Sequence, residues 1–231
     1  MKQLIILGGG FSVKDAIDNH NLWFKIQGME VWSLNSCFKA MPWLPSKQLF
    51  VDRDFWRHEA DSMEDLHKKG VPIITRNMGI LLENRPEITK YGVTRVRGEF
   101  KGLNGIKENL IFNGNMGLVG TFALHIAVCM DFDEIYLLGF DFGSSHVDNK
   151  FTHWYQESIP QLNIQSYGAA RPEVYLHKDA GHVNEIRKDI EDFQVFQNLG
   201  KVIWNVSLNS HITFFPRISY KEFFERLGKN E

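Results

Sequence analysis

The stretch LIILGGGFSVKD, residues 4–15, contains the unit that decides the fold. Four consecutive apolar residues, Leu4 to Leu7, predict a short buried strand that the three following glycines end. Ser12 and Asp15 have the spacing of a capping box, with Asp in place of the usual Glu, and predict the start of a helix. A strand, a tight turn and a helix in direct succession are typical of α/β proteins.

The same alternation continues along the rest of the chain. Apolar runs predict further strands at Glu30–Leu34, Gln48–Val51, Val71–Thr75, Val93–Val96, Leu110–Phe112, Glu134–Leu138 and Lys201–Val206. Helical spacing predicts helices from Phe55 to a cap at Gly70, from Gly117 to Met130, from Val183 to Phe196, and from a capping box at Ser219 to Gly228. Pro72 places the fourth strand at an edge of the sheet, or marks its start. The sequence therefore predicts an α/β fold: a doubly wound, mostly parallel, Rossmann-like sheet with helices on both faces.

Length and composition favour one domain. The chain has 231 residues, of which 43% are hydrophobic, so it can bury a substantial core. Typical domains of roughly 100–200 residues favour a single α/β domain over residues 1–231. Residues 142–180 lack periodicity and predict a lid-like insertion in that domain.

Charge and cysteine content exclude several classes of protein. Lys and Arg number 26 against 28 Asp and Glu, a formal charge of −2, which argues against a dedicated nucleic-acid binder. Cys37 and Cys129 are too few for a disulfide scaffold and fit a reducing cytoplasm. No apolar run reaches the ~18–20 residues of a membrane span. We expect a globular cytoplasmic protein, and the sequence leaves a homo-oligomer open.

Small and polar residues follow the predicted strands. Because ligands bind beyond the carboxyl ends of parallel strands, these residues predict the site. They are Gly8–Gly10, Asn35, Asp52 with Asp54, Asn77, and Gly139 with Asp141. We expect them to converge on one rim of the sheet.

The glycine turn is the first candidate for a phosphate site. A strand, three glycines and a helix start would present backbone N–H groups and a positive helix end to an anion. Gly8 and Gly10 match the first two positions of the dinucleotide fingerprint, but Val13 occupies the third. The alternative is a tight turn in which glycine permits close packing of helix and strand. We favour phosphate contact, because three consecutive glycines exceed what a turn requires.

Asn35 and the two aspartates have alternatives too. An asparagine at a strand end can bond a base or a sugar, whereas alone it is more often a cap of the following segment. Asp52 and Asp54 resemble the paired aspartates with which nucleotide-sugar transferases hold Mg²⁺ or Mn²⁺. Asp54 is equally placed to cap a helix that begins near Phe55, and capping is the favoured interpretation.

Two histidines are candidates for acid–base chemistry. His182 follows Gly181 just before a predicted helix, where it could act as a general base. Spacing alone does not favour it over His153, and no zinc spacing such as HExxH occurs. No GxSxG elbow occurs either, which argues against nucleophilic hydrolysis.

Four segments together resemble the sialyltransferase-like superfamily. They are LGGGFSVKD (7–15), VWSLNSCF (31–38), GLVGTFALHIAVCMDFDEIYLLGFDFG (117–143) and AGHVNEIRKDIEDF (180–193). The superfamily includes bacterial lipooligosaccharide sialyltransferases, archaeal-type 6-hydroxymethyl-dihydropterin diphosphokinases and uncharacterised phage proteins. The phage group is most similar by pattern, since it shares the EIYLLGFDF strand and a histidine–tryptophan element like residues 152–155. The similarity covers residues 2–55 and 113–208 and implies the sialyltransferase-like variant of the Rossmann-like fold.

The resemblance implies a nucleotide site. In the sialyltransferases the loop after the first strand and the asparagine after the second contact the CMP part of the donor. In this chain the loop and asparagine positions are Gly8, Gly9, Gly10, Ser12 and Asn35. The candidate nucleotide site also includes Gly120 at the start of the long helix, and Gly139 and Asp141 at the G-F-D-F strand end. The family has a hydroxyl residue where this chain has Val119, and Thr121 is the nearest substitute.

The resemblance also implies the catalytic residues. The family's general base lies in a Gly-His pair that matches Gly181 and His182, and it deprotonates the acceptor hydroxyl in an inverting displacement. Two family tyrosines that stabilise the departing phosphate fall at Gly143 and near Asn149 here. His153 or Tyr155 would then take that role.

The favoured function is a nucleotide-dependent transferase of glycosyltransferase type. It would move a sugar from a nucleotide-activated donor, with a CMP-sugar preferred, to a hydroxyl acceptor. One alternative is diphosphoryl transfer from ATP, as in the pterin branch, with Mg²⁺ held by Asp52, Asp54 and Asp141. The other is a nucleotide-binding phage protein without catalysis.

Overall fold

The computed structural model covers residues 1–231 and describes residues 1–75, 93–95, 118–130, 132–142, 154, 190–197 and 199–228. The described strands form one sheet of seven in the order β5-β4-β3-β2-β1-β6-β7, and every neighbouring pair is parallel. Their bounds are β1 Gln3–Leu7, β2 Val31–Leu34, β3 Lys47–Phe50, β4 Ile73–Thr75, β5 Val93–Arg95, β6 Glu134–Leu138 and β7 Val202–Asn205. The predicted α/β fold with a doubly wound parallel sheet is confirmed.

The strand order reverses between β1 and β6. From β1 the chain builds the sheet outward through β2 to β5, and β6 then returns to pair with the other side of β1. Leu7, the last residue of β1, is the Cα partner of Ser33 on one side and of Leu138 on the other. In open parallel sheets such a reversal leaves a crevice at the carboxyl ends of the strands, where ligands bind.

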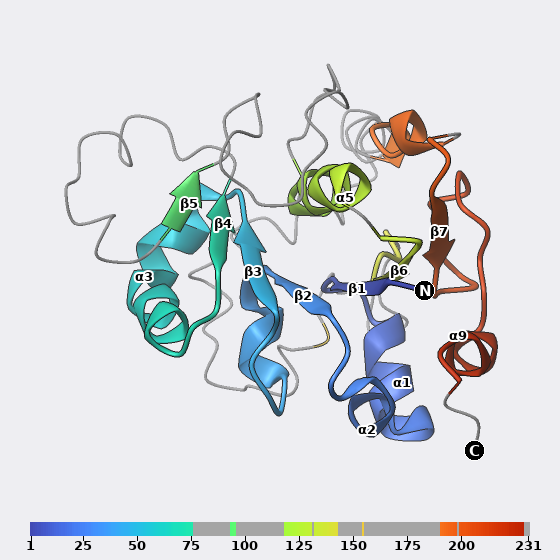
Figure 1. Cartoon of the computed structure of the whole chain (residues 1–231), viewed down its shortest axis with the longest axis horizontal. Coiled ribbons are helices and arrows are strands. Elements are labelled where there is room, and N and C mark those ends of the chain that lie inside the picture. The colour runs from blue at the N-terminus through green and yellow to red at the C-terminus, as the bar shows by residue number, and fades with distance from the viewer. Residues whose placement is uncertain are drawn as a thin grey trace, which may run out of the picture.

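Helices cover both faces of the sheet (Figure 1). One face carries α1 Ser12–His20, α2 Leu22–Ile26, α3 Arg53–Lys68 and α9 Tyr220–Arg226. The other carries α5 Val119–Cys129 and the short 3-10 helix η4 Gln194–Phe196. Alternate residues of β1 supply the two cores: Leu4 and Ile6 pack on the α5 side, and Ile5 and Leu7 on the α1 side.

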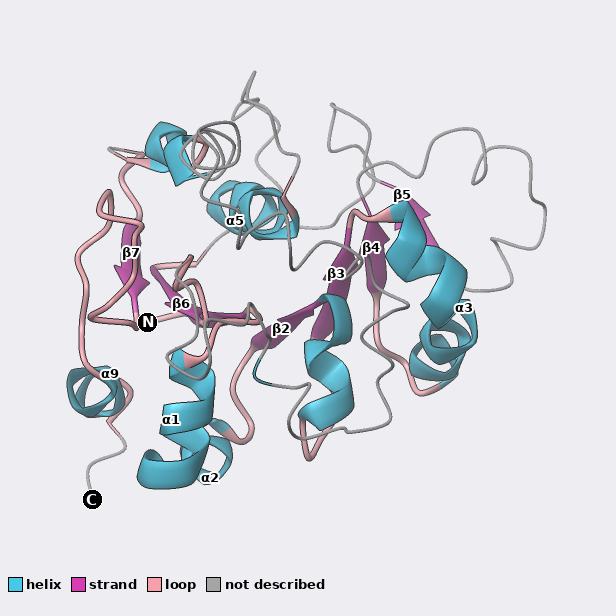
Figure 2. Cartoon of the chain, turned by 180° about the vertical axis from the view of Figure 1, so that it is seen from behind, coloured by secondary structure: helices cyan, strands magenta, loops and turns pink. Residues whose placement is uncertain are grey.

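Helix α5 is mostly apolar and is buried around almost its whole circumference. Its residues from Gly120 to Cys129 are all buried, because α5 lies between the sheet and the segment that contains η4 (Figure 2). A helix that is buried on all sides needs no polar face. Among the described residues, no helix combines the length and the apolarity that crossing a membrane requires.

The structure confirms most predicted element positions to within one or two residues. Strand β4 begins directly after Pro72 and lies inside the sheet, so the proline marks its start and the edge position is wrong. The capping box at Ser219 is present, with Ser219 Oγ accepting from the Glu222 backbone N–H. Leu110–Phe112, the beginning of the predicted 183–196 helix and nearly all of residues 142–180 lie outside the described residues.

Two predicted helix caps are wrong. The N-cap of α1 is Phe11, and Ser12 lies inside the helix without a capping bond from its side chain. Helix α3 begins at Arg53, so Asp54 is in its first turn and is not the residue that precedes it. The sequence also gave no sign of α2 or of the 3-10 helix η1, Asn35–Ala40.

Candidate functional site

The glycine turn after β1 meets the end of β6 at the reversal of strand order. The Gly8 N–H donates to the Leu138 carbonyl at 2.7 Å, and the Gly10 N–H donates to the Gly139 carbonyl at 2.8 Å. These two N–H groups are therefore already hydrogen-bonded to the end of β6. The expectation that they lie bare and available to a phosphate is wrong.

Close packing accounts for the glycines at this point. A Cβ on Gly8 would lie 2.8 Å from the Gly139 carbonyl oxygen, and one on Gly10 would lie 2.6 Å from Asp141 Oδ2. Gly139 has a φ of +72°, and its Cβ would lie 2.6 Å from the Gly8 carbonyl oxygen. The two strand ends approach so closely that only glycine fits, which is the alternative interpretation of the turn.

Asp141 occupies the helix end where a phosphate was expected. Its Oδ2 accepts from the Ser12 N–H at 2.8 Å, and its Oδ1 accepts from the Ser12 hydroxyl at 2.6 Å. A carboxylate at the start of α1 interacts favourably with the helix dipole. Ser12 and Asp141 thus satisfy each other, and a second anion on the Ser12 N–H would meet the negative charge of Asp141.

Tyr220 lies beside this pair. Burial raises the pKa of its phenol far above the ordinary value; a hydrogen bond with Ser12 lowers this pKa in part, and the negative charges of Asp141 and Asp15 raise it by smaller amounts. The phenol stays protonated at neutral pH, so Tyr220 cannot serve there as a base.

Trp154 joins the site from a distant part of the chain. Its indole N–H donates to the Gly8 carbonyl at 2.8 Å, and its backbone N–H donates to the Gly9 carbonyl at 3.2 Å. The side chain is 1% exposed and packs on Trp23, with ring centroids 5.7 Å apart. Sequence reasoning noticed Trp154 only within a histidine–tryptophan element and missed its contact with the turn.

Gly120 and Thr121 have structural roles at the start of α5. A Cβ on Gly120 would lie 2.7 Å from Cε1 of Phe140, so glycine is needed for this packing. Thr121 is fully buried, and its hydroxyl donates to the Leu118 carbonyl at 2.9 Å. The Thr121 hydroxyl proton is therefore bonded within the first turn of α5. This does not support the prediction that Thr121 replaces the family's ligand-binding hydroxyl.

Asn35 begins η1 at the end of β2, in the left-handed region with a φ of +49°. The N-cap of η1 is Leu34, and no side chain caps that helix, so the capping interpretation of Asn35 is wrong. Its Oδ1 atom is buried and has no hydrogen-bond partner among the described residues. An unpaired buried amide oxygen is costly unless something else bonds it.

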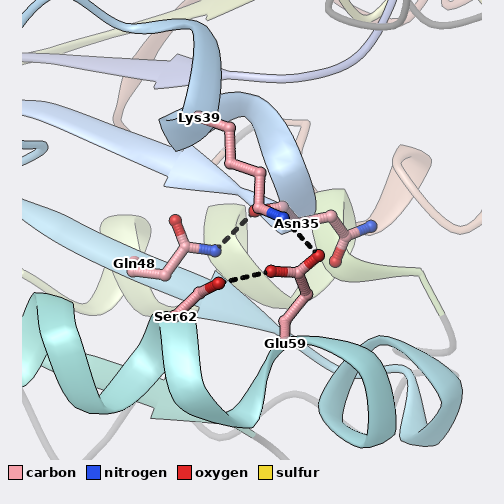
Figure 3. Close-up of polar contacts among 5 residues, drawn as sticks. All are labelled: Asn35, Lys39, Gln48, Glu59 and Ser62. Atoms are coloured by element: carbon pink, nitrogen blue, oxygen red, sulfur yellow. Dashed lines mark hydrogen bonds and ion pairs between the residues drawn. The ribbon is translucent and has the colours of Figure 1, made fainter. Parts of the chain in front are cut away.

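Three further side chains lie near Asn35 (Figure 3). Lys39, at the other end of η1, forms an ion pair with Glu59 of α3 at 2.6 Å. The second carboxylate oxygen of Glu59 accepts from the Ser62 hydroxyl at 2.7 Å. Glu59 is 2% exposed, so both of its oxygens are satisfied inside the protein.

The structure tests only one of the two aspartates after β3 as a metal ligand. Asp52 is exposed, and only the backbone of Asp54 is described. Within the described ranges no group of three His, Cys, Asp or Glu residues could hold a metal ion.

Both cysteines are buried free thiols. Burial raises the pKa of Cys129 to about 11 and that of Cys37 well above its ordinary range. Neither is a nucleophilic thiolate at neutral pH. His153, Tyr155 and His182 lie outside the described residues, and their catalytic roles stay predictions.

The fold is similar to that of two solved sialyltransferase structures. One is the sialyltransferase CstII from Campylobacter jejuni in complex with a substrate analogue, CMP-3FNeuAc; the TM-score is 0.53, the identity 14%, and the alignment covers 95% of this chain and 86% of that chain. The other is the sialyltransferase CST-II in complex with a trisaccharide acceptor and CMP, with a TM-score of 0.53, 15% identity and 100% of both chains covered. The chain therefore has a sialyltransferase-like fold.

Sequence comparison adds nothing to this likeness. No protein-family model matches the chain, and no curated protein matches it. At 14–15% identity the structural likeness establishes the fold. What the chain binds and transfers has to be argued from its own residues.

Proposed function

We propose that this chain is a nucleotide-dependent transferase of glycosyltransferase type, with a CMP-sugar as the favoured donor and a hydroxyl group as acceptor. The observation that carries the proposal is the contact of Trp154 with the Gly8 and Gly9 carbonyls. Through this contact Trp154 lies against the turn after β1, where the strand order reverses. The sequence neighbours of Trp154 are His153 and Tyr155. The similar solved structures, which hold CMP or a CMP-sugar analogue, support this choice of donor.

Asn35 is the residue that we assign to the nucleoside. Its amide lies at the carboxyl end of β2, next to β1, and its buried oxygen has no partner among the described residues. An amide oxygen in that state accepts a hydrogen bond from an amino group of a base or a hydroxyl of a ribose. Gly8, Gly10 and Gly139 shape the neighbouring turn, and their role is not to bond phosphate.

The reaction that we propose is a direct displacement at the sugar carbon. His182 takes the proton of the acceptor hydroxyl as its oxygen bonds that carbon, while the bond from the carbon to the phosphate oxygen breaks. CMP leaves with the electron pair, and His153 or Tyr155 donates a hydrogen bond to its phosphate. The protein's contribution is the alignment of donor and acceptor together with stabilisation of the leaving charge.

Nucleotide binding tests the proposal directly. The full chain is heated with CMP, CDP, UDP and ATP in turn, and the midpoint of thermal unfolding is followed with concentration. We expect a saturable rise with CMP that exceeds the rise with the other three nucleotides. The absence of a rise with any of them would overturn the proposal. Binding of CMP without slow hydrolysis of a CMP-sugar would indicate a nucleotide-binding protein without catalysis.

A histidine variant tests the chemistry. His182→Asn should lower kcat for transfer or hydrolysis by roughly 100- to 10,000-fold, the usual contribution of a general base, and leave the dissociation constant of CMP unchanged. His67→Asn on the exposed end of α3 is the matched control and should leave both quantities unchanged. Unaltered kcat in His182→Asn would exclude this histidine as the base.

A further inference from the structure

We propose that Gln48 is a positioning residue of the nucleotide site, which acts by holding Asn35 in its left-handed conformation. The inference rests on the proposed function for what Asn35 contacts, and on the structure for how Asn35 is held. Asn35 has a φ of +49°, where residues other than glycine are uncommon. A contact that keeps it there also fixes the direction of its side chain.

Gln48 makes that contact from the neighbouring strand. It lies in the middle of the sheet on β3, is fully buried, and has Ser33 of β2 as its Cα partner. Its Nε2 donates to the Asn35 carbonyl at 2.8 Å and to the Leu49 carbonyl at 3.3 Å. If Asn35 turned to an ordinary φ, its carbonyl would move and the buried amide would lose this acceptor, which is unfavourable.

The Gln48 contact does not involve the Asn35 side-chain oxygen, which has no hydrogen-bond partner among the described residues. Figure 3 shows the Asn35 side chain extending away from Gln48, whose hydrogen bond to Asn35 goes to the backbone carbonyl. The other end of η1 is held independently, since Lys39 is paired with Glu59 at 2.6 Å. The short helix is therefore fixed at both ends by two different elements, β3 and α3.

Ordinary core packing does not explain a glutamine at this position. Its Oε1 atom is buried without a hydrogen-bond partner among the described residues, and such an atom lowers stability relative to an apolar side chain. The hydroxyls of Ser33 and Thr75, on neighbouring strands, are also buried without partners in the described part of the chain. Of these three side chains, only that of Gln48 bonds Asn35 in the described contacts.

The test compares Gln48→Met with Thr75→Val in the full-length chain. Methionine keeps the length of the side chain and removes both N–H donors, whereas valine removes a buried hydroxyl of nearly equal shape. We expect the dissociation constant of CMP, measured by calorimetry, to rise about tenfold in Gln48→Met, as for the loss of one hydrogen bond. It should be unchanged in Thr75→Val, and equal losses in both variants would overturn the inference.

A double-mutant cycle separates positioning from general destabilisation. In an Asn35→Gly background the amide that Gln48 positions is gone, so adding Gln48→Met should cause no further loss of CMP affinity. A further tenfold loss would show that Gln48 acts by another route and would overturn the inference. Should Gln48→Met fail to fold, Gln48→Asn replaces it, because it keeps a buried amide but withdraws it from the Asn35 carbonyl by one methylene.

A crystal structure of the Gln48 variant provides a readout that needs no nucleotide. We expect the φ of Asn35 to leave the left-handed region in the variant. A φ that stays near its value in the native chain would overturn the inference, whatever the affinity shows. A native chain that binds no CMP would overturn the proposed function, and the φ of Asn35 would then decide the role of Gln48 by itself.

Discussion

Two turns follow neighbouring parallel strands at the same edge of the sheet, and they differ in what they leave unpaired. In the glycine turn after β1, the N–H groups of Gly8, Gly10 and Ser12 all bond groups at the end of β6. In the turn after β2, the carbonyl of Asn35 is bonded by Gln48 while its buried side-chain oxygen has no partner among the described residues.

The comparison shows that a sequence pattern typical of a ligand site does not by itself mean that the turn can bind a ligand. The glycine turn matches part of the dinucleotide fingerprint, yet its N–H donors at Gly8 and Gly10 bond the end of β6. The single asparagine is a weaker pattern, but its side-chain oxygen has no hydrogen-bond partner among the described residues. A turn at the carboxyl edge can bind a ligand only with groups that the fold has left available.

The largest effect should come from filling the glycine turn. Gly10→Ala places a Cβ 2.6 Å from Asp141 Oδ2 and 2.7 Å from the Gly139 carbonyl, and should lower the free energy of unfolding by about 3 kcal/mol. Gly28→Ala is the control: it has a φ of +81° and no atom within 4 Å, so strain alone should cost about 1 kcal/mol. Urea unfolding measures both. Equal losses would mean that the glycine turn has room for a ligand after all.

A smaller effect is expected from removing the charge at the start of α1. Asp141→Asn leaves one of the two oxygens that Ser12 bonds and should lower the free energy of unfolding by about 2 kcal/mol. Asp18→Asn, in an exposed pair with Lys14, should cost about 0.5 kcal/mol or less. If Asp141→Asn keeps its stability but loses CMP affinity, the carboxylate belongs to the ligand site, and the contrast between the two turns fails.

The smallest effect on stability should come from Asn35. Glycine adopts a positive φ without strain, so Asn35→Gly should change the free energy of unfolding by no more than about 0.5 kcal/mol. The same variant should weaken CMP binding about tenfold or more, because the proposed acceptor is gone. Chemical denaturation and calorimetry on one sample measure both quantities. A large loss of stability with unchanged affinity would make Asn35 a structural residue.

The two capping boxes predicted at Ser12 and Ser219 show how far local sequence reasoning reaches. Ser219 and Glu222 cap α9 as their spacing predicts, because both partners lie within one turn of the chain. Ser12 and Asp15 have similar spacing, but the Ser12 backbone N–H, which a capping box would bond to the Asp15 carboxylate, donates to Asp141, which is 129 positions away. A long-range acceptor displaced the local one, and no spacing in the sequence encodes that competition.

By itself the sequence determined where the described strands and most of the described helices lie, since apolar runs and turn residues act over a few neighbours. Tertiary structure decided which polar groups at the sheet edge are already bonded. Asp141 meets Ser12, and Trp154 meets Gly8 from 146 positions away, only because β6 returns to pair with β1. A hydrogen bond depends on distance in space, and for residues so far apart in the chain that distance is set by the folded sheet.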